Sequence, residues 1–147
     1  MRNKLKINLS GFTNIYTLFL LKSIYQLNKN GRAAYIIPSE FLNSDYGKYI
    51  KEYLLTSDTL RHIITFGFRQ NIFDDALTTS AIILLAKDKN DKQVCLSVAD
   101  SIGKLNGIAT IINNYPNAIG KNAIDKKNSE SQYQMESILP ETTKSGV

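Results

Sequence analysis

The chain has 147 residues, of which 43% are hydrophobic and 21% are charged, and its formal net charge is +5. This length and composition suit one globular domain, or part of one, and exclude a chain that is disordered throughout. A single cysteine, Cys95, and a single histidine, His62, exclude a disulfide framework and a Cys/His zinc cluster within this chain. We therefore predict a soluble, cytoplasmic protein without a metal site.

The excess positive charge lies at the start of the chain. Residues 1–30 carry five basic side chains and no acidic one, whereas the remaining residues carry 13 of each sign. A basic leading segment fits contact with an anionic partner such as nucleic acid, although a segment that only aids solubility has the same composition. The apolar run Ile15–Leu21 ends at Lys22, so it is too short for the ~20 residues of a membrane span. It predicts a buried helix.

The first predicted elements are a helix and a strand. Between residues 13 and 28 the apolar side chains recur at helical spacing in two adjacent stripes, which predicts a helix packed on two sides. Asn30 and Gly31 are residue types that adopt the left-handed conformation at helix ends. The unbroken apolar run Ala33–Ile37, closed by Pro38, is typical of a parallel strand that is covered on both faces. Helix, turn and buried strand together form half of an α/β unit.

A second helix and a pair of strands follow. The helix is predicted to begin after Asn43 or Ser44, either of which can cap it, with Asp45 in its first turn. The strands are Leu60–Phe66 and Ser80–Ala86, and the loop between them is long for a hairpin. Long ordered loops are more often functional than decorative, so this loop is a candidate for a binding role.

The last part of the chain becomes more polar. Residues Gln93–Val98 alternate and predict a further strand, and Gly107–Ile112 is a weaker strand candidate. From Asn113 onward Asn, Lys, Ser and Gln are frequent and little periodicity remains. We therefore divide the chain into a domain over residues 1–112 and a loosely ordered tail over residues 113–147.

Four pieces of sequence occur in the order seen in a known enzyme family. They are Asn14–Phe19, Leu27–Arg32, Ile36–Leu42, and Asn71–Ala76 followed by Thr79–Ile83. In these pieces the chain resembles the adenine-N6 DNA methyltransferases of restriction-modification systems, in particular the TaqI-like group. The resemblance runs from about Phe12 to Lys87 and covers the distal part of the catalytic domain.

The resemblance implies an α/β fold. This chain would supply the later part of a Rossmann-like, S-adenosylmethionine-dependent methyltransferase sheet that ends in an antiparallel hairpin. It also implies the reaction, in which a methyl group passes from S-adenosylmethionine to the exocyclic amine of an adenine in double-stranded DNA. The adenine is flipped out of the duplex because its amine is otherwise paired inside the helix.

Two aromatic residues match functional positions of that family. Phe19 matches the position whose ring packs against the adenine of the methyl donor, and Phe73 matches the position whose ring stacks on the flipped base. Both roles need only a flat apolar face. The alternative for Phe19 is a core residue on an apolar helix, and the alternative for Phe73 is an anchor for its own loop.

The sequence also departs from the family. The Asn-Pro-Pro-Tyr catalytic motif, the glycine-rich loop and the acidic residue that holds the ribose occur nowhere in it. We therefore expect no catalytic residue here, and interpret the chain as a fragment or split chain that is inactive alone and is partnered by a missing N-terminal half. The alternative is a non-catalytic DNA-binding or subunit-interaction module derived from such an enzyme. Without the first strands of the family sheet, the strand Ala33–Ile37 is expected to keep a free edge, which favours self-association.

The remaining polar residues have ordinary interpretations. His62 lies on a predicted strand and is expected to be a structural side chain, and Cys95 a small buried hydrophobic residue. Three basic residues are candidate phosphate contacts, with solvated surface positions as the alternative: Arg61, Arg69 and Lys87.

Overall fold

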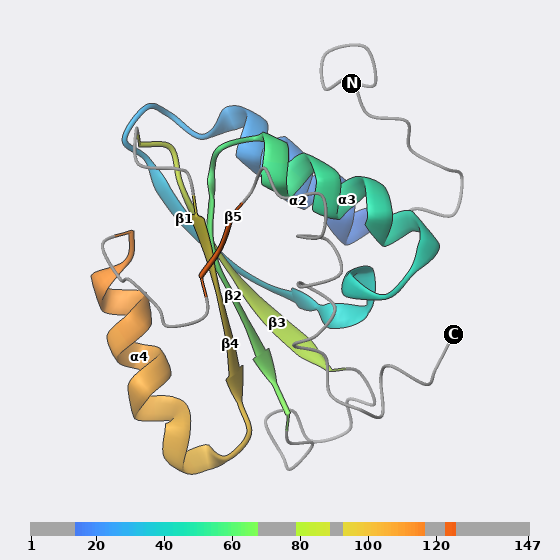
Figure 1. Cartoon of the computed structure of the whole chain (residues 1–147). Coiled ribbons are helices and arrows are strands. Elements are labelled where there is room, and N and C mark those ends of the chain that lie inside the picture. Colours follow the sequence, from blue (N-terminus) through green and yellow to red (C-terminus); the bar gives the residue numbers. More distant parts are fainter. Residues whose placement is uncertain (1–13, 68–78, 89–92, 117–122, 126–147) are drawn as a thin grey trace.

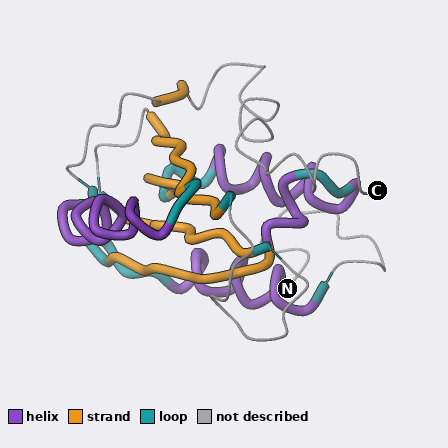
Figure 2. Tube along the Cα trace, turned by 90° about the horizontal axis from the view of Figure 1, so that it is seen from below, coloured by secondary structure: helices purple, strands orange, loops and turns teal. Residues whose placement is uncertain are grey.

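The strands form one mixed β-sheet, and helices cover both of its faces (Figure 1). This computed structural model describes residues 14–67, 79–88, 93–116 and 123–125. Helices α2 and α3 lie together on one face of the sheet and α4 lies on the other, and Figure 2 shows the same layers from below. In chain order the elements are α2 (Ile15–Gln26), β1 (Arg32–Pro38), η1 (Ser39–Leu42), α3 (Asp45–Thr56), β2 (Leu60–Phe66), β3 (Ser80–Ala86), β4 (Gln93–Ala99), η2 (Ile102–Lys104), α4 (Leu105–Asn114) and β5 (Ala123–Asp125).

The strands are ordered β1-β3-β2-β4-β5 across the sheet. Strand β3 is antiparallel to both β1 and β2, whereas β4 runs parallel to β2. Strands β1, β2 and β4 therefore point the same way, and their last residues, Pro38, Phe66 and Ala99, reach one edge of the sheet, where β3 begins at Ser80. We call this the carboxyl edge. The pair β2–β3 is the antiparallel hairpin that the resemblance implies, and β4 confirms the strand predicted over Gln93–Val98.

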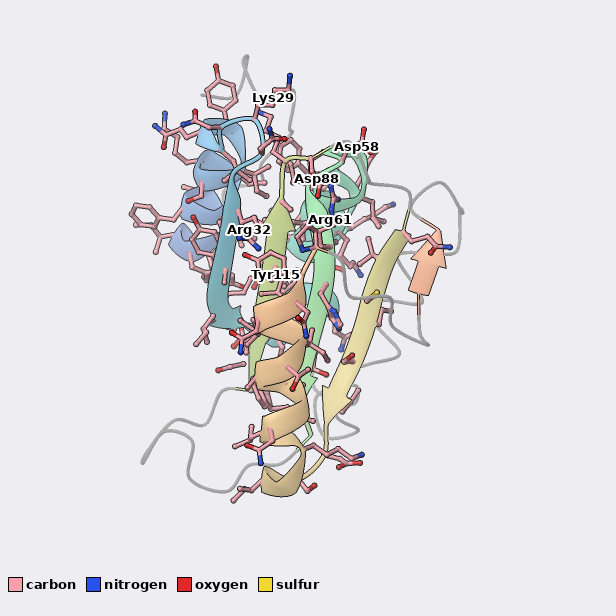
Figure 3. All side chains as sticks on the ribbon, turned by 90° about the vertical axis from the view of Figure 1, so that its left-hand side faces the viewer. Lys29, Arg32, Asp58, Arg61, Asp88 and Tyr115 are labelled. Atoms are coloured by element: carbon pink, nitrogen blue, oxygen red, sulfur yellow. The ribbon has the colours of Figure 1, made fainter. Side chains whose placement is uncertain are left out.

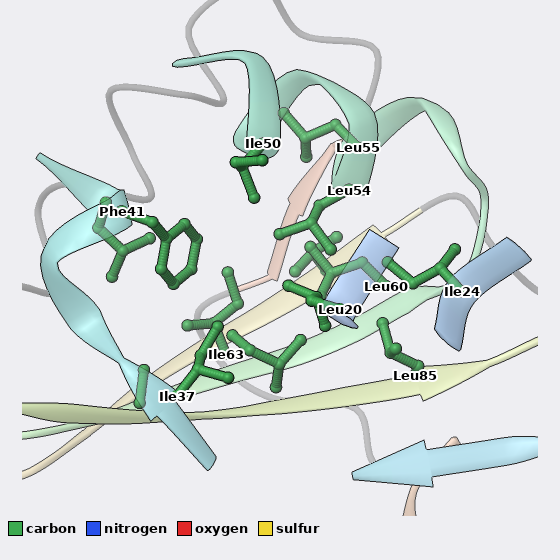
Figure 4. Close-up of a cluster of buried hydrophobic side chains, with 14 of the residues drawn as sticks. Leu20, Ile24, Ile37, Phe41, Ile50, Leu54, Leu55, Leu60, Ile63 and Leu85 are labelled. Carbon is green, nitrogen blue, oxygen red and sulfur yellow. The ribbon is translucent and has the colours of Figure 1, made fainter. Parts of the chain in front are cut away.

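Two clusters of buried apolar side chains hold the helices on the sheet. The larger cluster lies between the sheet and helices α2 and α3 and includes Leu20, Ile24, Ile50, Leu54, Ile63 and Leu85 (Figure 4). The smaller cluster lies under α4 and includes Ile64, Ile82, Leu84, Ile108 and Tyr115. Fully burying one such side chain contributes roughly 1.5–3 kcal/mol, so both layers stabilise the fold.

Strand β1 differs from its prediction. The run Ala33–Ile37 was expected to form a parallel strand covered on both faces. Instead, β1 pairs antiparallel with β3 and is the outermost strand of the described sheet. Its residues alternate in burial: Ile37 packs into the larger cluster, whereas Ile36 is 65% exposed on the other face. An apolar run shows that both faces of a strand are apolar, and it does not show that both are covered. No strand of the described residues pairs with the outer side of β1, and the expected free edge stays a prediction.

Helix α2 buries one face, where two were expected. Leu20, Leu21 and Ile24 are buried, whereas Ile15 is 70% exposed and Phe19 is 66% exposed. The expectation of packing on two sides is therefore wrong for the described residues. Nothing in the described part of the chain covers the face that carries Ile15 and Phe19.

The predictions for the residues at the helix ends are confirmed only in part. Asn30 adopts the left-handed conformation with φ of 62°, but Gly31 does not. Gly31 is needed for space instead, because a Cβ there would lie 2.8 Å from the carbonyl oxygen of Asn28. Helix α3 begins where predicted, with Ser44 at its N-cap position and Asp45 in its first turn, but the Ser44 side chain makes no capping hydrogen bond.

The weaker strand candidate, Gly107–Ile112, is wrong, because these residues lie within α4. Ile108, Ile111 and Ile112 are three and four residues apart, which places them on one helix face against the sheet. The boundary at residue 112 stays a prediction, although α4 continues to Asn114 and β5 pairs with β4 inside the expected tail. Within the described ranges, no helix is long and apolar enough to cross a lipid bilayer.

Candidate functional site

The carboxyl edge brings together the segments that enter and leave residues 68–78. Just after β1, the Ser39 backbone N–H donates to the carbonyl oxygen of Thr79 at 2.9 Å. The Ser39 hydroxyl donates to the same carbonyl at 3.1 Å, and its Oγ lies 2.6 Å from the Thr79 Oγ1. At the other end, the Gly67 N–H donates to the carbonyl oxygen of Ala99 at 2.8 Å. Gly67 and Thr79, the described residues on either side of 68–78, are therefore both hydrogen-bonded to the neighbouring strand ends.

A pair of tyrosine hydroxyl groups joins the first turns of α2 and α3 beside this edge. The Tyr16 and Tyr46 Oη atoms are 2.9 Å apart, and Asn14 Nδ2 donates to the Tyr46 Oη at 3.2 Å. Burial, and then the Tyr46 hydroxyl, raise the pKa of Tyr16 well above its usual range, and the charge of Glu40 in η1 adds to this. Tyr16 therefore stays protonated, and its contact with the Tyr46 hydroxyl joins the start of α2 to the start of α3.

Phe19 lies one helical turn beyond Ile15 on the exposed face of α2. Phe19 is 66% exposed, so it is not part of the core formed by the described residues. Its ring is open to a ligand or to another protein segment, and the role of adenine contact stays a prediction. Phe73 and Arg69 lie outside the described residues, so both assignments also stay predictions.

Two of the candidate phosphate contacts lie at the opposite edge of the sheet. Arg61 is buried and forms an ion pair with Asp88, and its Nη1 donates to the carbonyl oxygens of Asp58 and Leu60, each at 3.1 Å (Figure 3). Both expectations for Arg61, phosphate contact or solvated surface, are wrong. Its side chain has a structural role and links the start of β2 to neighbouring backbone and to Asp88. Lys87 is exposed, and its Nζ donates to the Leu27 carbonyl oxygen at 3.0 Å.

His62 and Cys95 are buried in the sheet, which confirms the burial predicted for Cys95. The His62 Nε2 lies 2.8 Å from the Ser97 Oγ, which joins β2 to β4. Burial lowers the pKa of His62 to about 4, so the ring is neutral at physiological pH. The described residues contain no cluster of three or more His, Cys, Asp or Glu side chains that could hold a metal ion.

The contact between Ser39 and Thr79 was missed by sequence reasoning. Both residues lie in segments that carry the resemblance, but each stands just outside a strand, where no periodicity marks it. Only the register of β1 against β3, in which Pro38 pairs with Ser80, brings them together across 40 positions of sequence.

Comparisons with known proteins agree with this architecture. Residues 1–73 match the Eco57I restriction-modification methylase family. The chain is 52% identical over 141 residues to the Type II methyltransferase M.AccI of Acinetobacter calcoaceticus, covering 96% of this chain and 25% of that protein. It is 33% identical over 85 residues to the Type II restriction enzyme and methyltransferase RM.Eco57I of Escherichia coli, covering 58% of this chain and 8% of that protein.

A solved structure shares the fold. The type IIG restriction endonuclease BpuSI superposes with a TM-score of 0.56 at 15% identity, covering 88% of this chain and 16% of that one. The α/β fold of this chain is therefore shared with part of that structure. The chain is a relative of the restriction-modification DNA methyltransferases, and its first 73 residues match the Eco57I methylases among them. It spans about a quarter of the length of M.AccI.

Proposed function

We propose that this chain is the distal part of the catalytic domain of an adenine-N6 DNA methyltransferase, as a fragment or split chain that is inactive alone. The observation that carries the proposal is the 52% identity to a Type II methyltransferase across 96% of the chain. The arrangement of the sheet supports it, because β1, β2 and β4 end at one edge and open α/β sheets bind their ligands outside the carboxyl ends of their strands.

S-adenosylmethionine would supply the methyl group to the complete enzyme. The described residues fit one part of that cofactor: Phe19 presents an exposed aromatic face on α2, whose start is held by the Tyr16–Tyr46 contact. We assign Phe19 to the adenine of the methyl donor. We assign Phe73 to the flipped target adenine, where stacking on an aromatic ring contributes ~1–3 kcal/mol per base.

The chain would not catalyse transfer by itself. Methyl transfer to the adenine amine needs hydrogen-bond acceptors that polarise it, and the Asn-Pro-Pro-Tyr motif that supplies them in the family is absent from this sequence. The partner we propose is the N-terminal half of the methyltransferase, which carries that motif, and the substrate is double-stranded DNA. Two observations support such a partner: no described strand pairs with the outer side of β1, and Ile15 and Ile36 are exposed. An unpaired apolar strand invites pairing with another segment.

Incubation of the purified chain with labelled methyl donor and unmethylated DNA tests this proposal. We expect no incorporation above background, and turnover without any other protein would overturn the claim that the chain is inactive alone. The remainder of M.AccI, outside the segment that this chain matches, is then added. Restored incorporation supports a split catalytic domain. Stable binding of this part without any incorporation favours the alternative, a subunit-interaction module.

A further inference from the structure

The C-terminal end of α2 carries a group of exposed basic and aromatic residues. Lys22 and Tyr25 lie three residues apart on the helix, Lys29 lies in the turn that follows it, and Lys87 comes directly after β3. All four residues are exposed, Tyr25 by 48%. We call this group the basic end of α2.

The charge around this group has one sign. The chain contains no acidic residue before Glu40, so neither α2 nor the turn after it carries a negative side chain. The C-terminus of a helix by itself repels anions, because its last carbonyl groups carry partial negative charge. Here the Lys87 Nζ donates to the carbonyl oxygen of Leu27 at 3.0 Å, which offsets that charge. The end of the helix is therefore open to an anion.

Two acidic residues lie at the same edge of the sheet as Lys29 (Figure 3). Asp88 forms an ion pair with the buried Arg61, so its charge is balanced within the fold. Asp58 is exposed, and the three lysines of the basic end outnumber it. The net charge that this end of α2 presents is therefore positive, which attracts a polyanion.

The ring of Tyr25 adds a second kind of contact. The Lys22 Nζ lies 5.8 Å from the centre of that ring, in a cation–π contact. A flat exposed ring among ammonium groups is the combination that holds an unpaired base together with its phosphates. A lipid surface would instead need several large apolar side chains beside the lysines. The exposed apolar residues of α2, Ile15 and Phe19, lie towards its other end.

We propose that the basic end of α2 binds single-stranded nucleic acid. An unpaired base stacks on the ring of Tyr25, and Lys22, Lys29 and Lys87 contact the phosphate groups on either side of it. This surface is separate from the carboxyl edge, because Lys87 and the end of α2 lie at the opposite edge of the sheet. The binding is independent of the proposed methyl transfer and needs neither a methyl donor nor another protein.

Fluorescence anisotropy of a labelled oligothymidine, titrated with the purified chain, tests this proposal. Each phosphate contact to a single strand contributes ~0.7 to the salt dependence of log K, so the double variant Lys22→Gln/Lys29→Gln should lower that slope by about 1.4. Tyr25→Ala should weaken binding about tenfold, whereas Tyr25→Phe keeps the flat ring and should preserve it. Unchanged binding and salt dependence in the lysine variant, or equal losses in Tyr25→Ala and Tyr25→Phe, would overturn the proposal.

The neighbouring helix α3 provides a matched control. Tyr49 is 41% exposed and follows the exposed Lys48, but Asp45 and Glu52 lie one helical turn away on either side of Tyr49. We expect Lys48→Gln and Tyr49→Ala to change neither the affinity nor the salt dependence. The variants of both helices should keep the melting temperature of the parent chain, because all the replaced side chains are exposed. Equal losses of binding from the two helices would show that α2 has no special role.

Two other ligands test the class of partner. A duplex of the same length should compete less well than the single strand, because its paired bases cannot stack on Tyr25. Equal competition by the duplex would overturn the preference for single strands. In sedimentation with vesicles of phosphatidylserine and phosphatidylcholine, we expect the chain to stay in the supernatant. Binding to these vesicles without any binding to the oligonucleotide would identify the basic end of α2 as a lipid-binding surface and contradict the proposal.

Discussion

The buried imidazole of His62 makes the stability of the sheet depend on pH. Its folded pKa is about 4 against 6.5 for the free side chain, because burial penalises the charged form. Above pH 6.5 the ring is neutral in both states and the full stability is present. As pH falls below 6.5, only the unfolded chain takes up the proton, so stability is lost until the folded ring titrates near pH 4. The total loss is about 3 kcal/mol.

Urea unfolding between pH 7 and pH 4 measures this loss. Carboxyl groups titrate in the lower part of the range, so the comparison is with His62→Gln, which keeps a polar side chain near the Ser97 hydroxyl and cannot take up the proton. We expect the variant to lose less stability than the wild-type chain on acidification, with the difference developing below pH 6.5. Parallel pH profiles for the two proteins would show that His62 is not responsible.

The assignment of Phe19 on α2 can be tested in a chimera in which this chain replaces the segment of M.AccI that it matches. If its ring stacks on the adenine of the methyl donor, Phe19→Ala should raise KM for the donor by about tenfold, whereas Phe19→Trp should preserve it. Tyr25 is a matched control, because it is a second exposed aromatic residue on the same helix. A similar rise in KM for Tyr25→Ala and Phe19→Ala would argue for a general effect on the helix.

At the scale of elements, the close approach of α3 to η1 depends on Gly47. A Cβ at this position would lie 1.6 Å from the Phe41 carbonyl oxygen, and the neighbouring backbone leaves no room for it. We expect Gly47→Ala to destabilise the chain by about 3 kcal/mol, since α3 must shift away from η1. In contrast, an added Cβ at Gly107 on α4 would have no atom within 4 Å apart from its chain neighbours and the backbone of its own helix.

Gly107→Ala is therefore the matched control for Gly47→Ala. It should stabilise the chain by roughly 0.5–1 kcal/mol, because alanine favours the helical conformation more than glycine does. Thermal and urea unfolding of both variants measures the two effects. Changes of the same sign and size would show that packing against η1 is not what distinguishes Gly47.

Most helices and strands could be predicted from the sequence, whereas their burial and their neighbours in the sheet could not. Helices α2 and α3 and strands β1 to β4 follow from apolar spacing and turn residues, because these depend on local sequence. Two of the failures have one cause. Ala33–Ile37 and Gly107–Ile112 are short apolar runs, and such runs do not reveal whether a strand is at an edge or whether a helix forms instead. The contact of Ser39 with Thr79 depends on strand register, which only the assembled sheet defines.

For the whole molecule, the free side of β1 predicts self-association of the isolated chain. The strand is seven residues long, pairs on one side only among the described residues, and exposes Ile36. Sedimentation velocity should detect concentration-dependent oligomers. Ile36→Lys places a charge on the edge strand and should shift the distribution towards monomer without lowering the melting temperature, since the side chain is already exposed. A wild-type chain that sediments as a single monomer would contradict this prediction.

The central claim is that this chain completes the catalytic sheet of an adenine-N6 methyltransferase. The most direct test is mass spectrometry of nucleosides from DNA treated with the chain together with the remainder of M.AccI, outside the segment that this chain matches, with each component alone as a control. The account predicts N6-methyladenine from the combined proteins and no methylated base from this chain alone. Methylated cytosine as the product, or N6-methyladenine formed equally well without this chain, would contradict it.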